Sequence, residues 1–277
     1  MTEQYAVIGN PIKQSKSPLI HAMFAQATGQ DMHYGRIEGA LGGFAAAVDA
    51  FRAAGGRGMN VTAPFKLDAF AYATQRSKRA ALAGASNALK FESSREGGRV
   101  LAENFDGVGL VRDVLDNLQC PMKAKRVLLL GAGGAARGVL LPFLEQKPAL
   151  LVLANRTAAK AAELAALVAD QGSVQACGLQ ELAGQSFDLV FNSTSASLSG
   201  ELPPLPPEVF APGCLAYELV YGKGLTPFLK FARGAGAARL ADGVGMLAEQ
   251  AAEAFLWWRG VRPQTREVID KITVPLT

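Results

Sequence analysis

The sequence predicts an α/β protein of two domains: an N-terminal α/β domain with a mostly parallel sheet, followed by a Rossmann-like nucleotide-binding domain. Short apolar runs alternate with helix-like segments along the chain. One such run, 126–130, leads directly into the glycine-rich segment 131–138. At 277 residues, 49% of them hydrophobic, the chain exceeds the usual size of one domain and suffices for two buried cores.

The N-terminal half alternates strands and helices. Residues 5–9 form an apolar run of strand length, and Ser17 before Pro18 predicts the N-cap and first position of a helix that ends near Thr28. The other elements expected here are a strand over 33–38, a helix over 41–54 that stops at Gly55 and Gly56, a strand over 58–62 and a short helical region from Pro64. Strands over 86–92 and 99–104 flank the polar turn 93–98 and predict an antiparallel hairpin at the sheet edge.

The second half continues the alternation. A helix over 106–118 leads to it, so we place the domain boundary near Asn104. The elements expected beyond it are strands over 126–130, 149–154, around Val174, over 187–191 and 215–219, and a helix over 158–169. After Gly243 an Ala-rich helix over 246–258 follows, and Pro263 starts a last helix whose partner is either domain.

The segment 131–138 predicts a nucleotide-binding turn. A tight turn at Gly131 and the missing side chain at Gly133 let backbone N–H groups and a helix N-terminus face a pyrophosphate. Ala136 is small enough for close packing of helix on strand, and the strand 149–154 follows at the spacing of a βαβ unit. The alternative interpretation is a tight turn without a ligand.

The end of that second strand indicates which dinucleotide is bound. Folds that bind NAD usually place Asp or Glu about 20 residues past the glycines, whereas this chain has Asn155, Arg156 and Thr157. A guanidinium binds a 2′-phosphate bidentately, so Arg156 predicts NADP, with Thr157 and Lys160 adding a hydroxyl and a second positive charge. Alternatively, Asn155 and Thr157 turn the chain and cap the next helix while Arg156 is solvated.

Composition excludes several other classes of protein. The formal net charge of +4 and pI near 9.0 come from dispersed basic residues, which favours an anionic small molecule over nucleic acid. The chain has three cysteines, Cys120, Cys177 and Cys214, and two histidines, His21 and His33. These residues support neither a disulfide framework nor a metal site, so we expect the protein in a reducing cytosol. The N-terminus shows no export signal and the chain no membrane span, so we expect a cytoplasmic protein.

Two residues at the predicted domain junction suggest redox chemistry. Lys66 follows a strand that stops before Pro64, and an ammonium placed there can stabilise and protonate the oxygen of a ketone during reduction by hydride. Asp106 can meet Lys66 and orient both it and a substrate hydroxyl. The alternatives are a solvated lysine and a helix-capping aspartate.

The loop 10–18 carries the hydroxyls of Ser15 and Ser17 at a predicted helix N-terminus. Hydroxyls and N–H groups in that position suit a substrate carboxylate. The alternative is that Ser17 only caps the helix.

With these motifs assembled, the chain closely resembles the bacterial, NADP-dependent shikimate dehydrogenases essentially from end to end. The motifs that carry the resemblance are Ser15-Lys-Ser-Pro18, Asn60-Val-Thr-Ala-Pro-Phe-Lys66, Gly84-Ala-Ser-Asn87, Asn104-Phe-Asp-Gly107, Gly131-Ala-Gly-Gly-Ala135, Asn155-Arg-Thr157 and Gly245-Met-Leu-Ala-Glu-Gln250. The resemblance implies an oxidoreductase of aromatic amino-acid and chorismate biosynthesis that reduces 3-dehydroshikimate to shikimate.

The same resemblance implies roles for individual residues. Lys66 matches the catalytic acid/base, with Asp106 beside it. The residues that match substrate-binding positions are Ser15, Ser17, Thr62, Asn87, Asp106, Tyr221 and Gln250. Those that match cofactor-binding positions are Gly131, Ala132, Gly133, Gly134, Ala135, Asn155, Arg156, Thr157, Lys160, Leu219 and Gly243. The C-terminal helices are implied to join the substrate domain, which then comprises 1–104 and 244–277, with the NADP-binding domain at 105–243.

Three positions depart from the family's commonest pattern: Ala88 replaces a Thr, Glu218 replaces an Asp, and Lys78 stands where many relatives are acidic. The alternative functions are a shikimate/quinate dehydrogenase with relaxed substrate use and a catalytically silent NADP-binding regulator. A monomer or a homodimer is expected.

Overall fold

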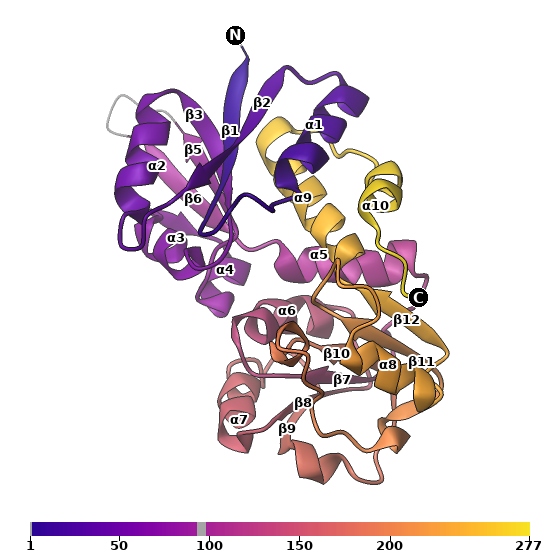
Figure 1. The fold of residues 1–277 in the computed structure, drawn as a ribbon. Coiled ribbons are helices and arrows are strands. Elements are labelled where there is room, and N and C mark those ends of the chain that lie inside the picture. The colour runs from indigo at the N-terminus through magenta and orange to yellow at the C-terminus, as the bar shows by residue number, and fades with distance from the viewer. Residues whose placement is uncertain (1, 93–97) are drawn as a thin grey trace. The chain divides into compact units, whose positions relative to one another are not determined.

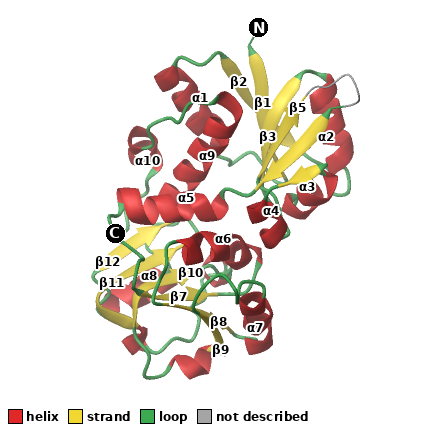
Figure 2. Cartoon of the chain, turned by 180° about the vertical axis from the view of Figure 1, so that it is seen from behind, coloured by secondary structure: helices red, strands yellow, loops and turns green. Residues whose placement is uncertain are grey.

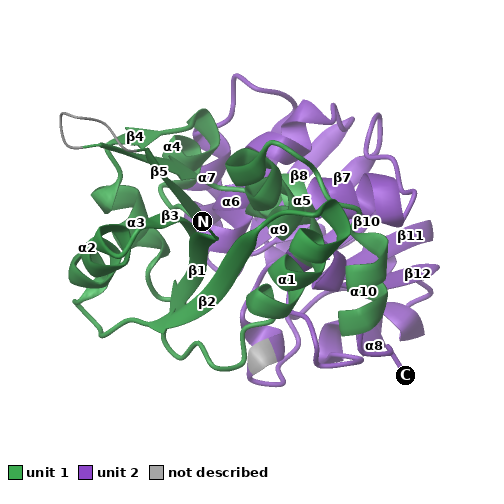
Figure 3. Cartoon of the chain, turned by 90° about the horizontal axis from the view of Figure 1, so that it is seen from above, with its two compact units in different colours: residues 1–109, 248–272 green, residues 110–247, 273–277 purple. Residues whose placement is uncertain are grey.

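A computed structural model shows two compact units; the residues it describes are 2–92 and 98–277. Unit 1 comprises Met1–Gly109 and Ala248–Ile272, and unit 2 comprises Leu110–Leu247 and Thr273–Thr277 (Figure 3). The chain passes between the units inside two helices, α5 (Asp106–Arg112) and α9 (Val244–Arg259), and again after Ile272, where the last helix ends. The division of the functional domains at Asn104 and Gly243 stays a prediction.

Unit 1 is built on a six-stranded mixed sheet in the order β2-β1-β3-β5-β6-β4 (Figure 1). Its strands are β1 (Glu3–Gly9), β2 (Met32–Glu38), β3 (Gly56–Val61), β4 (Gln75–Arg76), β5 (Ala88–Glu92) and β6 (Arg99–Glu103). β1 pairs in parallel with β2 and β3, whereas β5 runs antiparallel to both β3 and β6. One face of the sheet packs on a core that includes Ile8, Met59 and Leu89, all fully buried.

The predicted hairpin is confirmed, but it does not form the edge of the sheet. The short strand β4, which we did not predict, pairs in parallel with β6 and takes that position. A strand of two residues has no periodicity for sequence analysis to detect. Of the predicted turn 93–98, residues 93–97 lie outside the described part of the chain.

The helices of unit 1 are α1 (Ser17–Thr28), α2 (Phe44–Ala53), α3 (Lys66–Tyr72), α4 (Lys78–Ala83) and α10 (Arg266–Ile272). Most of them lie close to their predicted positions, but α4 was not predicted and the last helix begins at Arg266 instead of Pro263. The prediction that Ser17 is the N-cap was wrong: Lys16 occupies that position without a side-chain cap, and Ser17 is the first helical residue. Gly56 does not end α2 but begins β3, because its backbone pairs with β1.

Unit 2 is a Rossmann-like fold with a fully parallel six-stranded sheet in the order β12-β11-β10-β7-β8-β9. The strands are β7 (Arg126–Leu130), β8 (Leu150–Asn155), β9 (Val174–Gly178), β10 (Phe187–Asn192), β11 (Phe210–Glu218) and β12 (Arg239–Asp242). Its helices α6 (Gly134–Glu145), α7 (Ala158–Ala166) and α8 (Pro227–Gly234) lie against the sheet (Figure 2). The predicted helix over 106–118 is α5 followed by a π-helical turn, Asp113–Asn117.

The order of strands in unit 2 locates a ligand site. The chain reverses its winding direction between β7 and β10, which are neighbours in the sheet, and ligands of open α/β sheets bind beyond the carboxyl ends of strands at such a switch point. Those ends are Leu130 and Asn192. No helix among the described residues is both long and apolar enough to span a membrane.

Candidate functional site

In unit 1 the structure brings Lys66 and Asp106 into direct contact. Lys66 is the first residue of α3, and Asp106 is the first residue of α5, three positions after the end of β6. Lys66 Nζ donates a hydrogen bond to Asp106 Oδ2 at 2.6 Å, and their side chains are 35% and 16% exposed. The contact holds the amino group of Lys66 at one place, while the side chain as a whole is partly exposed.

Asn87 joins this pair to two further segments of unit 1. Its Nδ2 donates to Asp106 Oδ1 at 2.8 Å and to Gln250 Oε1 at 3.2 Å. Its Oδ1 accepts a hydrogen bond from Phe105 N at 2.8 Å, which fixes the orientation of the amide. Four residues that the sequence placed at a site thus form one hydrogen-bonded group: Lys66, Asp106, Asn87 and Gln250.

Asp106 is itself held by a turn. Asn104 Oδ1 accepts a hydrogen bond from Asp106 N at 3.1 Å, and Asn104 Nδ2 donates to Ala85 O at 3.1 Å. Asn104 is 3% exposed, so this turn is a buried part of the scaffold. The carboxylate of Asp106 accepts hydrogen bonds from Lys66 and Asn87, while the side chain of Asn104 accepts one from the first N–H of α5.

The two serines lie together at the start of α1. Ser17 is 7% exposed, and its backbone N–H donates to Ser15 Oγ at 3.3 Å. Arg36 Nη2 donates to Ser15 O at 2.8 Å and so ties the loop to β2. Thr62 directly follows β3, and its backbone N–H donates to Ile8 O at 3.0 Å.

Sequence analysis did not single out Asn60 as a site residue, yet it contacts this group. Asn60 Nδ2 donates to Asn87 O at 3.3 Å, and Asn60 Oδ1 accepts from Tyr34 OH at 2.6 Å. Burial raises the pKa of Tyr34 well above its ordinary value, and a hydrogen bond to Ser17 opposes that rise. The available signal was an amide side chain in a strand two positions before Thr62, and hence on the same face of the sheet.

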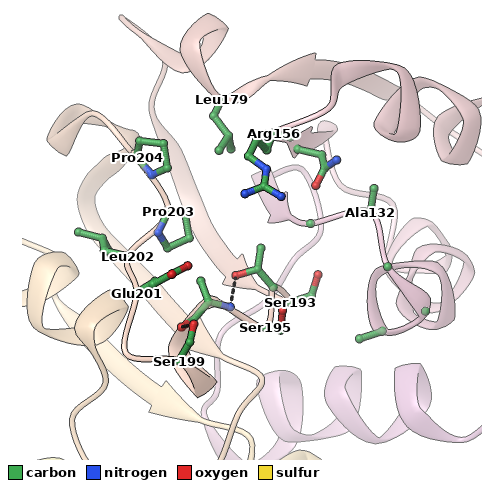
Figure 4. Close-up of a pocket in the computed structure, with 18 residues that line it drawn as sticks. Ala132, Arg156, Leu179, Ser193, Ser195, Ser199, Glu201, Leu202, Pro203 and Pro204 are labelled. Carbon is green, nitrogen blue, oxygen red and sulfur yellow. Dashed lines mark hydrogen bonds between the residues drawn. The ribbon is translucent and has the colours of Figure 1, made fainter. Parts of the chain in front are cut away.

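Unit 2 contains a cavity of about 510 Å³ at the predicted glycine turn (Figure 4). The predicted cofactor residues that line it are Gly131, Ala132, Gly133, Gly134, Ala135, Asn155 and Arg156. Arg156 projects from the end of β8 toward the cavity, opposite Pro203 and Leu202. The wall that the sequence did not predict consists of Leu179, Ser193, Thr194, Ser195, Ala196, Ser199, Glu201, Leu202, Pro203 and Pro204.

The glycine turn has the geometry that a pyrophosphate needs. Gly131 has φ +106°, and a Cβ added there would lie 2.8 Å from Ser193 Oγ. A Cβ on Gly133 or Gly134 would meet nothing within 4 Å, so backbone faces open space there. Gly133 is the N-cap of α6 and supplies no side-chain cap, which leaves first-turn N–H groups for an anion. The residues present therefore fit a dinucleotide.

Other predicted residues of this unit are absent from the lining of the cavity. Among the described residues, Thr157, Lys160, Leu219, Gly243 and Tyr221 are not part of its lining. Thr157 occupies the N-cap position of α7, as the alternative interpretation expected, but its side chain makes no capping hydrogen bond. A Cβ on Gly243 would lie 2.2 Å from Leu219 O, so only glycine allows these two segments to touch.

One unit with a lysine–carboxylate pair and a second with a dinucleotide turn together define a dinucleotide-dependent oxidoreductase. Three family models match the chain: "Shikimate dehydrogenase substrate binding domain" at residues 7–89, "Shikimate / quinate 5-dehydrogenase" at 112–199 and "Shikimate 5'-dehydrogenase C-terminal domain" at 243–272. The chain belongs to the shikimate dehydrogenase family.

Individual relatives are similar to this chain over nearly its whole length. A "Shikimate dehydrogenase (NADP(+))" of Chromobacterium violaceum is 55% identical over 98% of each chain. The crystal structure of an Ael1 enzyme from Pseudomonas putida is 60% identical, with a TM-score of 0.94 over 99% of this chain and 100% of that one. A shikimate 5-dehydrogenase from Thermus thermophilus, crystallised with NADP(H) and shikimate, is 30% identical with a TM-score of 0.83 over 97% of each chain.

Proposed function

We propose that this protein is an NADP-dependent shikimate dehydrogenase that reversibly reduces 3-dehydroshikimate to shikimate. The observation that carries the proposal is the 2.6 Å contact between Lys66 and Asp106 in a chain whose relatives have this activity. The cavity at the glycine turn and the exposed guanidinium of Arg156 support NADP as the cofactor.

Lys66 is assigned as the acid and base of the reaction. When bound, NADPH supplies the hydride, and the electron pair of the substrate carbonyl moves to its oxygen. The Lys66 ammonium stabilises that negative charge and gives the oxygen a proton, and in the reverse direction neutral Lys66 removes the proton from the hydroxyl. Asp106 holds the ammonium through its Oδ2 and keeps it directed.

The substrate contacts follow from the chemistry of shikimate, which carries a carboxylate and ring hydroxyls. Ser15 and Ser17 are assigned to the carboxylate, because their hydroxyls lie at the N-terminus of α1. Thr62, Asn87, Asp106 and Gln250 are assigned to the ring hydroxyls. The Thr62 hydroxyl and the two amides can donate hydrogen bonds to a hydroxyl or accept them from it, and the Asp106 carboxylate accepts them. Tyr221 of unit 2 is assigned to the carboxylate.

Separate groups of residues are assigned to the separate parts of the dinucleotide. The backbone of Gly131–Ala135 and the first turn of α6 are assigned to the pyrophosphate. The residues assigned to the 2′-phosphate and its ribose are Asn155, Arg156, Thr157 and Lys160, and those assigned to the nicotinamide end are Leu219 and Gly243. The forked donors of a guanidinium fit a phosphate dianion better than they fit a ribose hydroxyl. The proposed cofactor is therefore NADP, which carries the 2′-phosphate, and not NAD.

The proposal is tested by following reduction of NADP⁺ and NAD⁺ at 340 nm with shikimate and with quinate. Turnover is expected with shikimate and NADP⁺. One matched family model also names quinate, so turnover of quinate at a comparable kcat/KM would support the shikimate/quinate enzyme instead. Absence of turnover with every pair, together with binding of NADP⁺, would support the silent regulator.

Two further assignments concern the localisation and the oligomeric state of the protein. We place the protein in the cytoplasm, because a biosynthetic dehydrogenase needs NADPH and the three cysteines are unpaired thiols. A monomer or homodimer is expected, and sedimentation equilibrium distinguishes them.

A further inference from the structure

A buried carboxylate in unit 2 takes no part in the chemistry described above. Glu218, the last residue of β11, is 0% exposed. Its Oε2 accepts hydrogen bonds from Asn192 Nδ2 at 3.1 Å, from Thr226 Oγ1 at 3.2 Å and from Ser197 Oγ. Burial raises the pKa of Glu218, and the hydrogen bonds oppose that rise. One oxygen atom thus joins the end of β10, the turn at 196–198 and the N-terminus of α8.

Asn192 connects this carboxylate to the cavity. Because its Nδ2 is directed at Glu218, its Oδ1 faces the other way and accepts from Thr194 N at 3.1 Å and Thr194 Oγ1 at 2.7 Å. If the amide rotated by half a turn, its oxygen would face a carboxylate oxygen and its NH₂ would face two donors. The carboxylate therefore selects the one amide orientation that holds the turn after β10.

The turn held in this way is one wall of the cavity. Ser193, Thr194 and Ser195 line it, and Ser193 Oγ donates to Leu130 O at 2.6 Å, which places the turn against the end of β7. A Cβ on Gly131 would lie 2.8 Å from Ser193 Oγ, so the wall and the glycine turn have little space between them. A displacement of 193–196 would therefore change the shape of the site where the backbone faces a dinucleotide.

We propose that Glu218 is a positioning residue of the dinucleotide pocket, which fixes the wall 193–196 through Asn192 and Ser197 and thereby sets the affinity for NADP(H). This inference rests on the proposed function, since it takes the cavity as the cofactor site. Glu218 itself is not part of the cavity lining. Its effect passes through two side chains whose orientation it determines.

The test is a fluorescence titration of the purified full-length protein with NADPH, in wild type, Glu218→Gln and Ser197→Ala. Glu218→Gln removes the charge that selects the Asn192 orientation, and we expect the Kd for NADPH to rise about tenfold, as for loss of a charge-assisted hydrogen bond. Ser197→Ala removes one donor and should raise this Kd about threefold. The KM for shikimate should stay unchanged in Ser197→Ala, since that variant keeps all assigned substrate contacts.

Tyr217→Phe is the matched control. Tyr217 is adjacent to Glu218 on β11, is also 0% exposed and points to the opposite face, where its hydroxyl donates to Asp113 Oδ2 at 2.7 Å. The variant removes a buried hydrogen bond without touching the Glu218 network, so Tm should fall while the Kd for NADPH stays at the wild-type value. An equal loss of affinity in Tyr217→Phe would overturn the positioning role, because it would indicate general loosening.

The outcomes separate this inference from the proposed function. Wild-type affinity in both Glu218→Gln and Ser197→Ala overturns the inference and leaves the function intact. If Glu218→Gln does not fold, Ser197→Ala decides. If the wild-type protein does not bind NADPH, both the inference and the proposed cofactor fail.

Discussion

Lys66 Nζ and Asp106 Oδ2 lie 2.6 Å apart although their residues are 40 positions apart in the chain. The two side chains meet because α3 and α5 both start at strand ends of the same sheet, β3 and β6. Asn87 then holds the second carboxylate oxygen. Lysine, aspartate and asparagine thus form a chain of contacts in which moving one member disturbs the next.

Lys66→Ala should remove the acid and base without removing the cofactor pocket. We expect kcat for shikimate oxidation to fall by about a hundredfold to ten-thousandfold, the usual contribution of a positioned proton donor. The Kd for NADPH should remain at its wild-type value, because the pocket lies in unit 2. Stopped-flow and steady-state assays measure kcat, and a fluorescence titration measures the Kd; unaltered turnover would exclude the assigned role.

Asn87→Ala should affect both stability and catalysis. The side chain is 3% exposed, and its loss leaves Phe105 N without an acceptor and Asp106 Oδ1 without a donor. A cost of about 1–3 kcal/mol in the free energy of unfolding is expected for unsatisfied buried groups. Urea denaturation measures this cost, and kcat/KM for shikimate should fall in the folded enzyme. Thr28→Ala, which removes a side-chain hydrogen bond within α1, is the control expected to keep wild-type kcat/KM.

The residues of the cavity that contact the phosphates in the proposal were predictable from the sequence, whereas those of the opposite wall were not. Gly131 and Arg156 were predictable because a phosphate turn is a local pattern of glycines between a strand and a helix. The wall from Ser193 to Pro204 was not, since it reaches the glycine turn only through the neighbouring strands β7 and β10. Its sole local signal was a group of small polar residues directly after a buried strand.

The same distinction holds for the fold. Apolar runs of five or six residues predicted the central strands of both sheets, whereas the shorter strands β4 and β12 depend on tertiary pairing with β6 and β11. Ser17 was assigned as an N-cap from its residue type, yet the structure starts α1 one position earlier in the backbone, with Lys16 as the cap. Residue preference at a helix end gives way to loop geometry, here the hydrogen bond from Ser17 N to Ser15 Oγ.

Two glycine substitutions should separate folding from cofactor access. Gly131→Ala forces a side chain onto φ +106° and to within 2.8 Å of Ser193 Oγ, so a loss of about 1–3 kcal/mol in stability is expected along with weaker NADPH binding. Gly133→Ala introduces a Cβ that meets nothing within 4 Å of protein. Its Tm should therefore match wild type while its Kd for NADPH rises. Equal Kd values for Gly133→Ala and wild type would argue against a pyrophosphate at this turn.

Arg156→Gln should change the choice of cofactor. Loss of a charge-assisted contact with a phosphate corresponds to about a tenfold or larger rise in KM for NADP⁺. The KM for NAD⁺, which has no 2′-phosphate, should change little, so the ratio of kcat/KM values moves toward NAD⁺. Arg126→Gln is the control: Arg126 also belongs to unit 2, but its side chain binds Ser186 O and Gln185. An equal rise of the KM for NADP⁺ in both variants would show that the rise comes from the lower net charge of the protein, not from a contact of Arg156 with the phosphate.

His21 should make the protein sensitive to acid. The ring is 0% exposed, stacks on Tyr34 at 4.1 Å and is hydrogen-bonded through Nε2 to Asn60 Oδ1. Burial lowers the pKa of His21 from 6.5 to about 3, which the hydrogen bond to Asn60 only partly opposes. Since the unfolded chain then binds the proton more tightly than the folded one, this contribution to stability is fully present above pH 6.5. It is lost as the pH falls from 6.5 toward 3, by about 1.4 kcal/mol per pH unit.

Urea denaturation at pH 7.5, 6.0 and 5.0 measures this slope, and His21→Phe isolates it. Phenylalanine keeps a planar ring between Tyr34 and Phe255 but cannot take up a proton. Asn60 Oδ1 retains the hydrogen bond from Tyr34 OH in that variant. We therefore expect a lower absolute stability and a slope smaller by about one proton between pH 6 and 5. A slope equal to that of wild type would mean that other groups, rather than His21, take up the proton on acid unfolding.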